Sequence, residues 1–427
     1  MLLCWAGQAV CCAGQACCNC LWMACSEWGA HKKVFSKLGY IAISFFSIFL
    51  SFLFLFFAKD MKDQVSFFIS INCPDGTEAW FGISAVYRMS FALVVFHTLM
   101  LIILLICKGL ESEIGPILND GCWTFNIMII FTVFVASFWI DNKYIMYYGY
   151  FWRLASALFL IFQGIWILSI AYKLNRSLVD YHSSTGSGYS MAILLAVTAL
   201  FYIFDAIFFY HQIKWFGSCQ FNIWVFVVLI IMFVIFTIMT VLQTREDASI
   251  LTNSIVVSYL LYLSWSAFAS EKNESCNPFL KSDSNTLAQI VLGFVFTSIS
   301  LLSISIVTKN NTSNENGFES NWAESEDSEE IKDIEIGNQK INVEDSYIFP
   351  TSYATMFFHG IMILAWAYYA MLISNWGDPT INHSRTHFFS ANDFSVGMKL
   401  FSQLVCYLIF SFSLIGPLIW PDRDWDD

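Results

Sequence analysis

YYGYFWRLASALFLIFQGIWILSIAYKLNRSLVDY, residues 147–181, is an apolar span that passes into an amphipathic tail with no proline to end it. The core of a bilayer requires only about 20 helical residues, each of which adds about 1.5 Å. If this stretch is helical throughout, it must tilt steeply or leave the membrane at one end. We therefore predict one long diagonal helix here.

The composition of the chain is that of a membrane protein. Of its 427 residues, 57% are hydrophobic, 18% are aromatic and 13% are charged. Apolar windows long enough to cross a bilayer, about 18 residues or more, recur along it. We predict an all-α polytopic membrane protein. Apolar length gives about ten transmembrane helices, at residues 38–58, 83–107, 123–140, 147–171, 189–210, 221–242, 249–269, 287–307, 353–373 and 394–420.

The remaining regions complete the predicted organisation. A long acidic linker separates the first eight helices from the last two, because 11 acidic and only two basic residues lie between residues 315 and 345. So little apolar area cannot offset the cost of ordering, which predicts disorder. The predicted parts are a Cys-rich membrane-associated segment (1–37), helices one to eight (38–308), the acidic cytosolic linker (309–350), helices nine and ten (351–420) and an acidic tail (421–427).

The net charge of −12 is concentrated in that linker, so the rest of the chain is nearly neutral. A nearly neutral surface excludes nucleic acid as a partner.

An even number of helices places both termini on the same side, and we predict that side to be the cytosol. Nine Lys and Arg residues then lie near inner helix ends and seven in outer loops. Cys73, Cys219 and Cys276 would lie in outer loops, as would the candidate glycosylation sites Asn273 and Asn382. The plasma membrane and the endomembranes both fit this arrangement.

Cysteines are concentrated at the N-terminus, where seven of the 13 lie in the first 25 residues. Positive charge follows this segment rather than preceding it, so we interpret it as part of the mature protein and not as a secretory signal. Paired thiols beside a membrane are candidates for acylation, and the alternatives are close packing of a small-residue helix or a zinc site. The candidate acylation sites are Cys11, Cys12, Cys17 and Cys18.

The three outer cysteines, Cys73, Cys219 and Cys276, allow one disulfide and leave one thiol over. The sequence does not give the connectivity, and three unpaired thiols are the alternative. Pairing is favoured because exposed thiols in an oxidising compartment tend to form disulfides.

Charged residues inside transmembrane helices often mark function. Arg88, Arg153, Asp205 and Lys399 all fall near the outer ends of predicted helices and could share one depth. A pair such as Arg88 with Asp205 would offset part of the cost of removing each charge from water. The functional interpretation is a polar groove for lipid headgroups or small solutes. The structural alternative is that the basic side chains extend to the interface while Asp205 pairs locally.

No catalytic motif accompanies these charges. The chain has no H-E-x-x-H, G-x-S-x-G or phosphate-binding loop and no suitably spaced carboxylate pair, so we predict neither an enzyme nor a metal or other cofactor. His97 and His359 lie alone on their predicted helices, and we expect hydrogen-bonded packing roles for them.

Several short motifs resemble the serine incorporator family. The most specific is YLLYLSWSA at residues 259–267, followed by Cys276, Asn277 and Pro278. AVYR at residues 85–88, NDGCW at 119–123 and the Cys-rich start agree with it. The single residues that carry the resemblance are Tyr87, Arg88, Tyr262, Trp265, Ser266, Cys276, Asn277, Pro278, His359, Asn375 and Trp376.

The resemblance implies a ten-helix protein with two subdomains, a long diagonal helix between them and a lipid-accessible groove. It also implies a part in supplying serine to phosphatidylserine and sphingolipid synthesis, and in moving phospholipids between leaflets. The expected partners are membrane phospholipids and sphingolipids, lipid-synthesis enzymes and further copies of the chain. A serine or small-solute transporter and a scaffold for lipid-synthesis enzymes remain the alternatives to a lipid scramblase.

Overall fold

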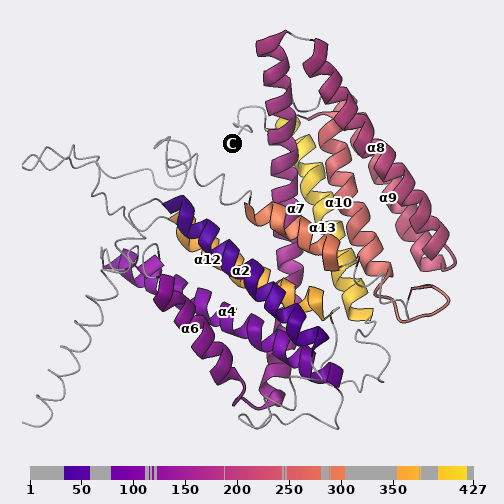
Figure 1. Cartoon of the computed structure of the whole chain (residues 1–427). Helices are drawn as coiled ribbons and strands as arrows, with labels where there is room; N and C mark the ends of the chain where they lie inside the picture. Colours follow the sequence, from indigo (N-terminus) through magenta and orange to yellow (C-terminus); the bar gives the residue numbers. More distant parts are fainter. Residues whose placement is uncertain are drawn as a thin grey trace, which may run out of the picture. The chain divides into compact units, whose positions relative to one another are not determined.

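The computed structural model is helical across the parts of the chain that it describes, which are residues 33–57, 78–110, 115, 118–119, 123–186, 188–242, 245, 248–279, 288, 290–302, 353–374, 376 and 393–420. A further short apolar helix, Ile290–Leu302, precedes the predicted linker. The labelled helices in Figure 1 are α2 (Lys33–Phe56), α4 (Glu78–Gly109), α6 (Trp123–Ser137), α7 (Asn142–Thr185), α8 (Gly188–Phe216), α9 (Gln220–Val241), α10 (Ile250–Phe268), α12 (Tyr353–Ile373) and α13 (Asp393–Ile419).

Seven of the described helices are long and apolar enough to cross a membrane, and three shorter apolar helices accompany them. Each of them overlaps one of the ten segments predicted from apolar length, and α7 and α8 extend well beyond theirs. The predicted class, an all-α polytopic membrane protein, is therefore confirmed.

Helix α7 contains the stretch that decides the fold, and it is unbroken over 44 residues. At about 1.5 Å per residue its length is about 66 Å, well beyond the thickness of a bilayer core. The prediction of one long helix is confirmed. After α7 the chain reverses at Gly186, whose φ of 60° lies in the left-handed region that glycine adopts without strain.

The described helices divide between two compact units, each of which draws on residues before and after the predicted linker. The first unit comprises Met1–Phe49, Phe91–Ser137 and Ile304–Ile363. The second comprises Leu50–Ser90, Phe138–Ser303 and Leu364–Asp427.

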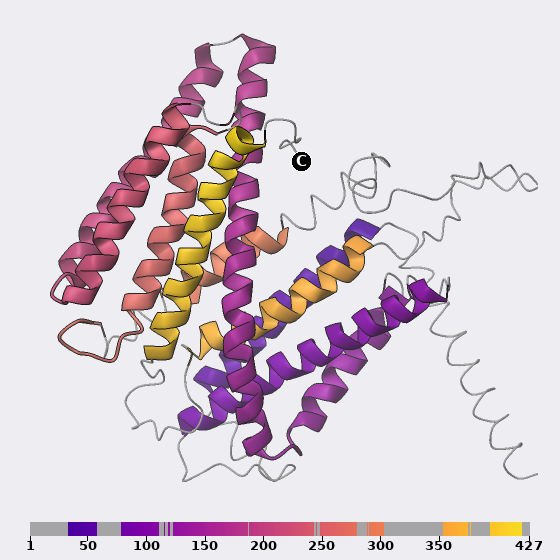
Figure 2. The ribbon, with the colours of Figure 1, turned by 180° about the vertical axis from the view of Figure 1, so that it is seen from behind.

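Helix α10 forms the core of the second unit. It packs against α7, α8, α9 and α13, which lie around it in both views (Figures 1 and 2). All of its 19 residues except Ile250 and Ile255 are buried. Its first turn is capped by the Ser249 hydroxyl, which accepts a hydrogen bond from the Thr252 amide. This helix therefore meets protein on nearly every face, which permits polar residues that lipid would not tolerate.

In the first unit the core forms around Tyr40 of α2. Its ring contacts Phe96 of α4, Trp123 of α6 and Phe358 of α12. Gly39 allows this approach, because a Cβ atom added there would collide with the Trp123 ring. The first unit is thus a packed group of helix segments with an aromatic centre.

Candidate functional site

The buried polar side chains of α10 are the most extensive polar feature of the second unit. Serine, threonine and asparagine side chains recur along a helix that is otherwise apolar. They need hydrogen-bond partners, because an unpaired polar group in a membrane interior costs several kcal/mol. The buried members are Thr252, Asn253, Ser254, Ser258, Ser264 and Ser266.

On the side of α10 that faces α8 and α9, hydrogen bonds join the helices at three successive levels, which we call the polar ladder. At the first level Asn253 donates to the Tyr202 hydroxyl at 3.2 Å and to the Thr237 hydroxyl at 2.8 Å. At the second, the Ser258 hydroxyl donates to Oδ1 of Asp205 at 2.6 Å.

The third level of the polar ladder is formed by Gln212. Its Nε2 donates to the Leu261 carbonyl at 3.0 Å, and its Oε1 accepts from the Ser264 hydroxyl at 3.1 Å. Asp205 and Gln212 are seven residues apart, a spacing that places both on one face of α8. The ladder therefore follows the α8–α10 contact over several helical turns.

Asp205 lies deeper in its helix than the sequence suggested. The apolar window ends near residue 210, but the candidate span of α8 runs from Met191 to Phe216. Asp205 is thus 11 residues, or about 16 Å, from the end of that span. The prediction that it lies near an outer end is wrong, because the bonds of Gln212 to α10 allow α8 to continue past its first polar residues.

Near the middle of a span, a charged carboxylate costs about 2.5–3.5 kcal/mol on insertion scales. Asp205 is 5% exposed, and its second oxygen, Oδ2, has no hydrogen-bond partner among the described residues. The pair of Arg88 with Asp205 that the sequence suggested is also wrong, because the carboxylate is bonded to Ser258 instead.

Asp205 is buried although the other side of α8 is exposed. Its neighbours on the outer face, Ile203, Phe204 and Ile207, are each more than half exposed. On the inner side, Phe208 stacks on Phe204 and packs edge to face against Trp265 of α10. The carboxylate therefore lies on the buried side of a helix whose other side is exposed and apolar.

The opposite side of α10 carries a separate polar network toward α7 and α13. The Tyr259 hydroxyl shares its one hydrogen between the Leu160 carbonyl at 2.8 Å and Oε1 of Gln163 at 3.1 Å. Gln163 donates to Thr297 at 3.0 Å. Gln403 of α13 donates to the Leu260 carbonyl at 3.0 Å. These bonds fix α10 among its neighbours.

The three predicted groove cations each donate to main-chain carbonyls near helix ends. Nη2 of Arg88 donates to the Ile140 carbonyl at 3.0 Å, and Nη2 of Arg153 to the Trp376 carbonyl at 3.4 Å. Nζ of Lys399 donates to the Ser266 carbonyl at 2.9 Å and the Ser270 hydroxyl at 2.8 Å.

All three of these cations are buried, and each lies six residues from the start of its candidate span. Because the last carbonyls of a helix lack intrahelical partners, a cation there satisfies a structural need. A shared groove lined by these cations stays a prediction.

In the first unit the two histidines bond to each other. Nδ1 of His97 lies 2.9 Å from Nδ1 of His359, and Nε2 of His359 lies 2.8 Å from Oδ1 of Asn119. Tyr40 donates to the Asn119 carbonyl at 2.8 Å and accepts from Asn126 at 3.1 Å. The packing roles expected for these histidines agree with this geometry, although sequence analysis did not suggest the contact between them.

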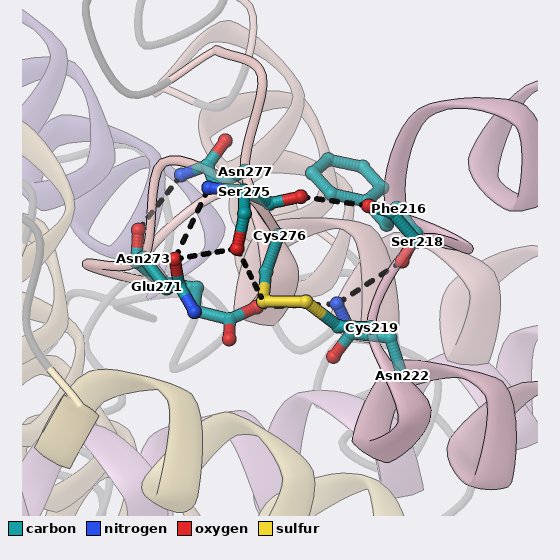
Figure 3. The surroundings of a disulfide bond; sticks show 9 residues. All are labelled: Phe216, Ser218, Cys219, Asn222, Glu271, Asn273, Ser275, Cys276 and Asn277. Carbon is teal, nitrogen blue, oxygen red and sulfur yellow. Dashed lines mark hydrogen bonds between the residues drawn. A yellow bond between two sulfur atoms is a disulfide. The ribbon is translucent and has the colours of Figure 1, made fainter.

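A disulfide joins Cys219, before α9, to Cys276, after α10, with 5.3 Å between their Cα atoms (Figure 3). This is one of the pairings that the sequence left open, and Cys73 lies outside the described residues. Glu271 approaches both sulfurs. Because those sulfurs are bonded to each other, they are not available as thiolate ligands for a metal.

The residues beside the disulfide explain the Cys-Asn-Pro motif. Nδ2 of Asn277 donates to the Ala269 and Glu271 carbonyls, each at 3.0 Å, and thereby closes the end of α10 (Figure 3). Ser218 donates to the Ser275 carbonyl at 2.7 Å. Asn273 is exposed, and its Oδ1 accepts from the Ser275 amide and hydroxyl. Its glycosylation stays a prediction.

The other motif residues are mostly buried near helix ends. Tyr87 lies 3.3 Å from the Ser374 hydroxyl, and Tyr262 lies 3.1 Å from the Tyr368 hydroxyl. Trp376 follows α12 with a φ of 58°, an uncommon backbone conformation for a bulky residue. Asn375, Asn382, the candidate acylation sites Cys11, Cys12, Cys17 and Cys18, and the acidic linker lie outside the described residues.

Comparisons with known proteins agree with the motifs. The family model described as serine incorporator matches residues 10–423. The chain is 28% identical over 385 residues to serine incorporator 3 of Bos taurus, covering 80% of each chain. It is 26% identical over 374 residues to a probable serine incorporator of Nematostella vectensis, covering 81% of each. A probable serine incorporator of Dictyostelium discoideum is 26% identical over 378 residues, covering 83% of this chain and 87% of its own.

Proposed function

Because the chain belongs to the serine incorporator family, we propose that it is a non-enzymatic membrane protein that moves phospholipid headgroups between leaflets. In this proposal it thereby supports the incorporation of serine into phosphatidylserine and sphingolipids. The observation that carries the proposal is the polar ladder between α8 and α10, which sets polar groups at successive depths in a helix pair.

A headgroup that crosses a bilayer needs polar partners along its path, while its acyl chains remain in lipid. The polar ladder supplies hydroxyl, amide and carboxylate groups. Its outer wall is α8, most of which is exposed and apolar. Separation of α8 from α10 would open the ladder to lipid and would require no catalytic residue.

The proposed topology places both termini in the cytosol, in the plasma membrane or an endomembrane. The disulfide supports this orientation, because disulfides persist in oxidising compartments and Cys219 and Cys276 lie at the ends of α9 and α10 that would face outward.

Two glutamines give a matched test of the path. Gln212 and Gln403 are both buried, and each donates from Nε2 to a carbonyl of α10 at 3.0 Å. Gln212 belongs to the polar ladder, whereas Gln403 approaches α10 from α13. Each glutamine is replaced by methionine, and the purified variants are reconstituted in vesicles with labelled phosphatidylcholine.

We expect the native chain to accelerate leaflet exchange over protein-free vesicles. Gln212→Met should change the exchange rate several-fold more than Gln403→Met, at a similar loss of thermal stability. Exchange no faster than in protein-free vesicles would overturn the scramblase proposal. Uptake of labelled serine by the same vesicles would then favour a carrier, and binding to a lipid synthase without uptake would favour a scaffold.

A further inference from the structure

The carboxylate of Asp205 is held in position through one oxygen only. Its Oδ1 accepts the short hydrogen bond from Ser258, and its Oδ2 is buried without a hydrogen-bond partner among the described residues. The surroundings are apolar: Phe208 and Phe209 follow on α8 and pack against a cluster that includes Val257 of α10. A charged carboxylate in such a place is stabilised by a positive or donating group beside its free oxygen.

Three kinds of group could satisfy Oδ2, and the geometry separates them. A proton on either oxygen would neutralise the carboxyl group, but it would not give Oδ2 a hydrogen-bond partner among the described residues. A divalent ion requires several charged or oxygen ligands. Among the described residues, the only close group of three or more Asp, Glu, His or Cys side chains is at the disulfide, away from Asp205.

The third kind of group is a primary ammonium, which supplies both a positive charge and hydrogen-bond donors. It carries three N–H donors on a compact positive charge, so one of them can bond to Oδ2 at short range. Oδ1 of Asn253, on the level next to Asp205, is also buried without a hydrogen-bond partner among the described residues.

Access to Asp205 is from the bilayer. The side chains that flank it on the outer face of α8, among them Ile203 and Ile207, are exposed over the apolar part of the span. A ligand that reaches this depth must tolerate lipid on one side while it presents its polar end inward. These requirements describe a lipid headgroup better than a soluble cation.

We propose that Asp205, oriented by Ser258, recognises the primary ammonium group of a ligand during its passage along the polar ladder. The inference rests on the proposed function, because it assigns a headgroup class to the same path. Two sources offer this chemistry: the headgroup of an aminophospholipid, such as ethanolamine or serine, and free serine. Choline carries the same charge without an N–H donor and cannot make the bond to Oδ2.

The test uses a series of lipids labelled on the acyl chain whose headgroups are ethanolamine, N,N-dimethylethanolamine and choline. These headgroups lose N–H donors step by step. The purified full chain in vesicles should exchange the ethanolamine lipid about tenfold or more faster than the choline lipid, as expected from one charge-assisted hydrogen bond. Asp205→Asn should bring this ratio close to one. Asp180→Asn makes the same chemical change at an exposed position on α7 and should keep the ratio.

A second measurement is independent of transport. In detergent, lysophosphatidylethanolamine should raise the melting temperature of the native chain more than lysophosphatidylcholine, and Asp205→Asn should remove the difference. Stabilisation by free serine that depends on Asp205 would identify the soluble source.

Fast exchange with no headgroup preference would overturn this inference and leave the proposed function intact. Preferential stabilisation without any exchange would uphold recognition of the ammonium group by Asp205 and overturn the scramblase proposal. If both lysolipids stabilise the native chain equally, and the Asp205→Asn variant behaves in the same way, the inference about Asp205 is overturned directly.

Discussion

Nδ1 of His97 lies 2.9 Å from Nδ1 of His359, and this contact determines where the protons lie. Oδ1 of Asn119 can only accept, so Nε2 of His359, at 2.8 Å from it, must carry a hydrogen. In neutral imidazole the Nδ1 of His359 is then the acceptor, and Nδ1 of His97 is the donor. Two histidines that are 262 residues apart in sequence, on α4 and α12, are thus joined by a bond with a defined direction.

Removal of one histidine should therefore cost more than its own packing. His359→Phe leaves Nδ1 of His97 and Oδ1 of Asn119 without these bonds, and we expect a loss of about 1–3 kcal/mol. The double variant with His97→Phe should lose less than the sum of the single changes, because the two residues share one interaction. Thermal unfolding in detergent measures the three variants, and strictly additive losses would contradict the coupling.

Variants at Lys399 can show whether this cation has a structural role or lines the lipid path. Its Nζ closes the end of α10 through Ser266 and Ser270. Lys399→Met should lower the stability by about 1–3 kcal/mol, and Ser270→Ala by about half as much, because only one acceptor is lost. Thermal unfolding and lipid exchange are measured on the same preparations. A changed exchange rate with unchanged stability would instead assign Lys399 to the lipid path.

The disulfide predicts that its single and double cysteine variants lose the same amount of stability. Cys219→Ser, Cys276→Ser and the double variant each remove the same cross-link, so their melting temperatures should fall by similar amounts, equivalent to about 2–4 kcal/mol. Reduction of the native chain should produce a fall of the same size. If only one single variant is destabilised, the loss comes from packing at that cysteine and not from the cross-link.

Gly293 is a position where a methyl group does not fit. A Cβ atom there would lie 2.6 Å from the Tyr262 hydroxyl and 2.7 Å from the Leu372 side chain. Gly293→Ala should therefore disturb the contact of Tyr262 with Tyr368 and cost about 1–3 kcal/mol. Gly397→Ala, an exposed helical position with no atom within 4 Å of the added Cβ, provides the control. It should leave stability unchanged or raise it by about 0.5–1 kcal/mol.

Apolar length was sufficient to predict the helices, because each span must satisfy its own backbone in lipid. It failed at the end of α8, where the polar residue Gln212 closes the apolar window although its bonds to Leu261 and Ser264 keep it inside the protein. Hydropathy measures the cost of a side chain in lipid and does not register a partner on another helix.

The same limit explains why the contacts of the candidate site could not be predicted from the sequence. The bond from Ser258 to Asp205 spans 53 residues of sequence, and the contact of His97 with His359 spans 262. No local spacing records which helices become neighbours, so each residue looked isolated. The sequence reduced the candidate disulfide cysteines to three, because disulfide formation depends on the compartment and on the position of the loops. Which two of the three form the bond became clear only from the fold.

The continuous helices on either side of Gly186 also have a practical consequence. At about 66 Å, α7 exceeds even the full thickness of a bilayer with its headgroups, about 40–45 Å, and it continues with α8 beyond the ends of its neighbours (Figures 1 and 2). Both helices run to within a residue or two of the turn. A rigid soluble helical protein inserted at Gly186 would inherit their orientation and serve as a marker for particle alignment in electron microscopy, beyond the ends of the neighbouring helices.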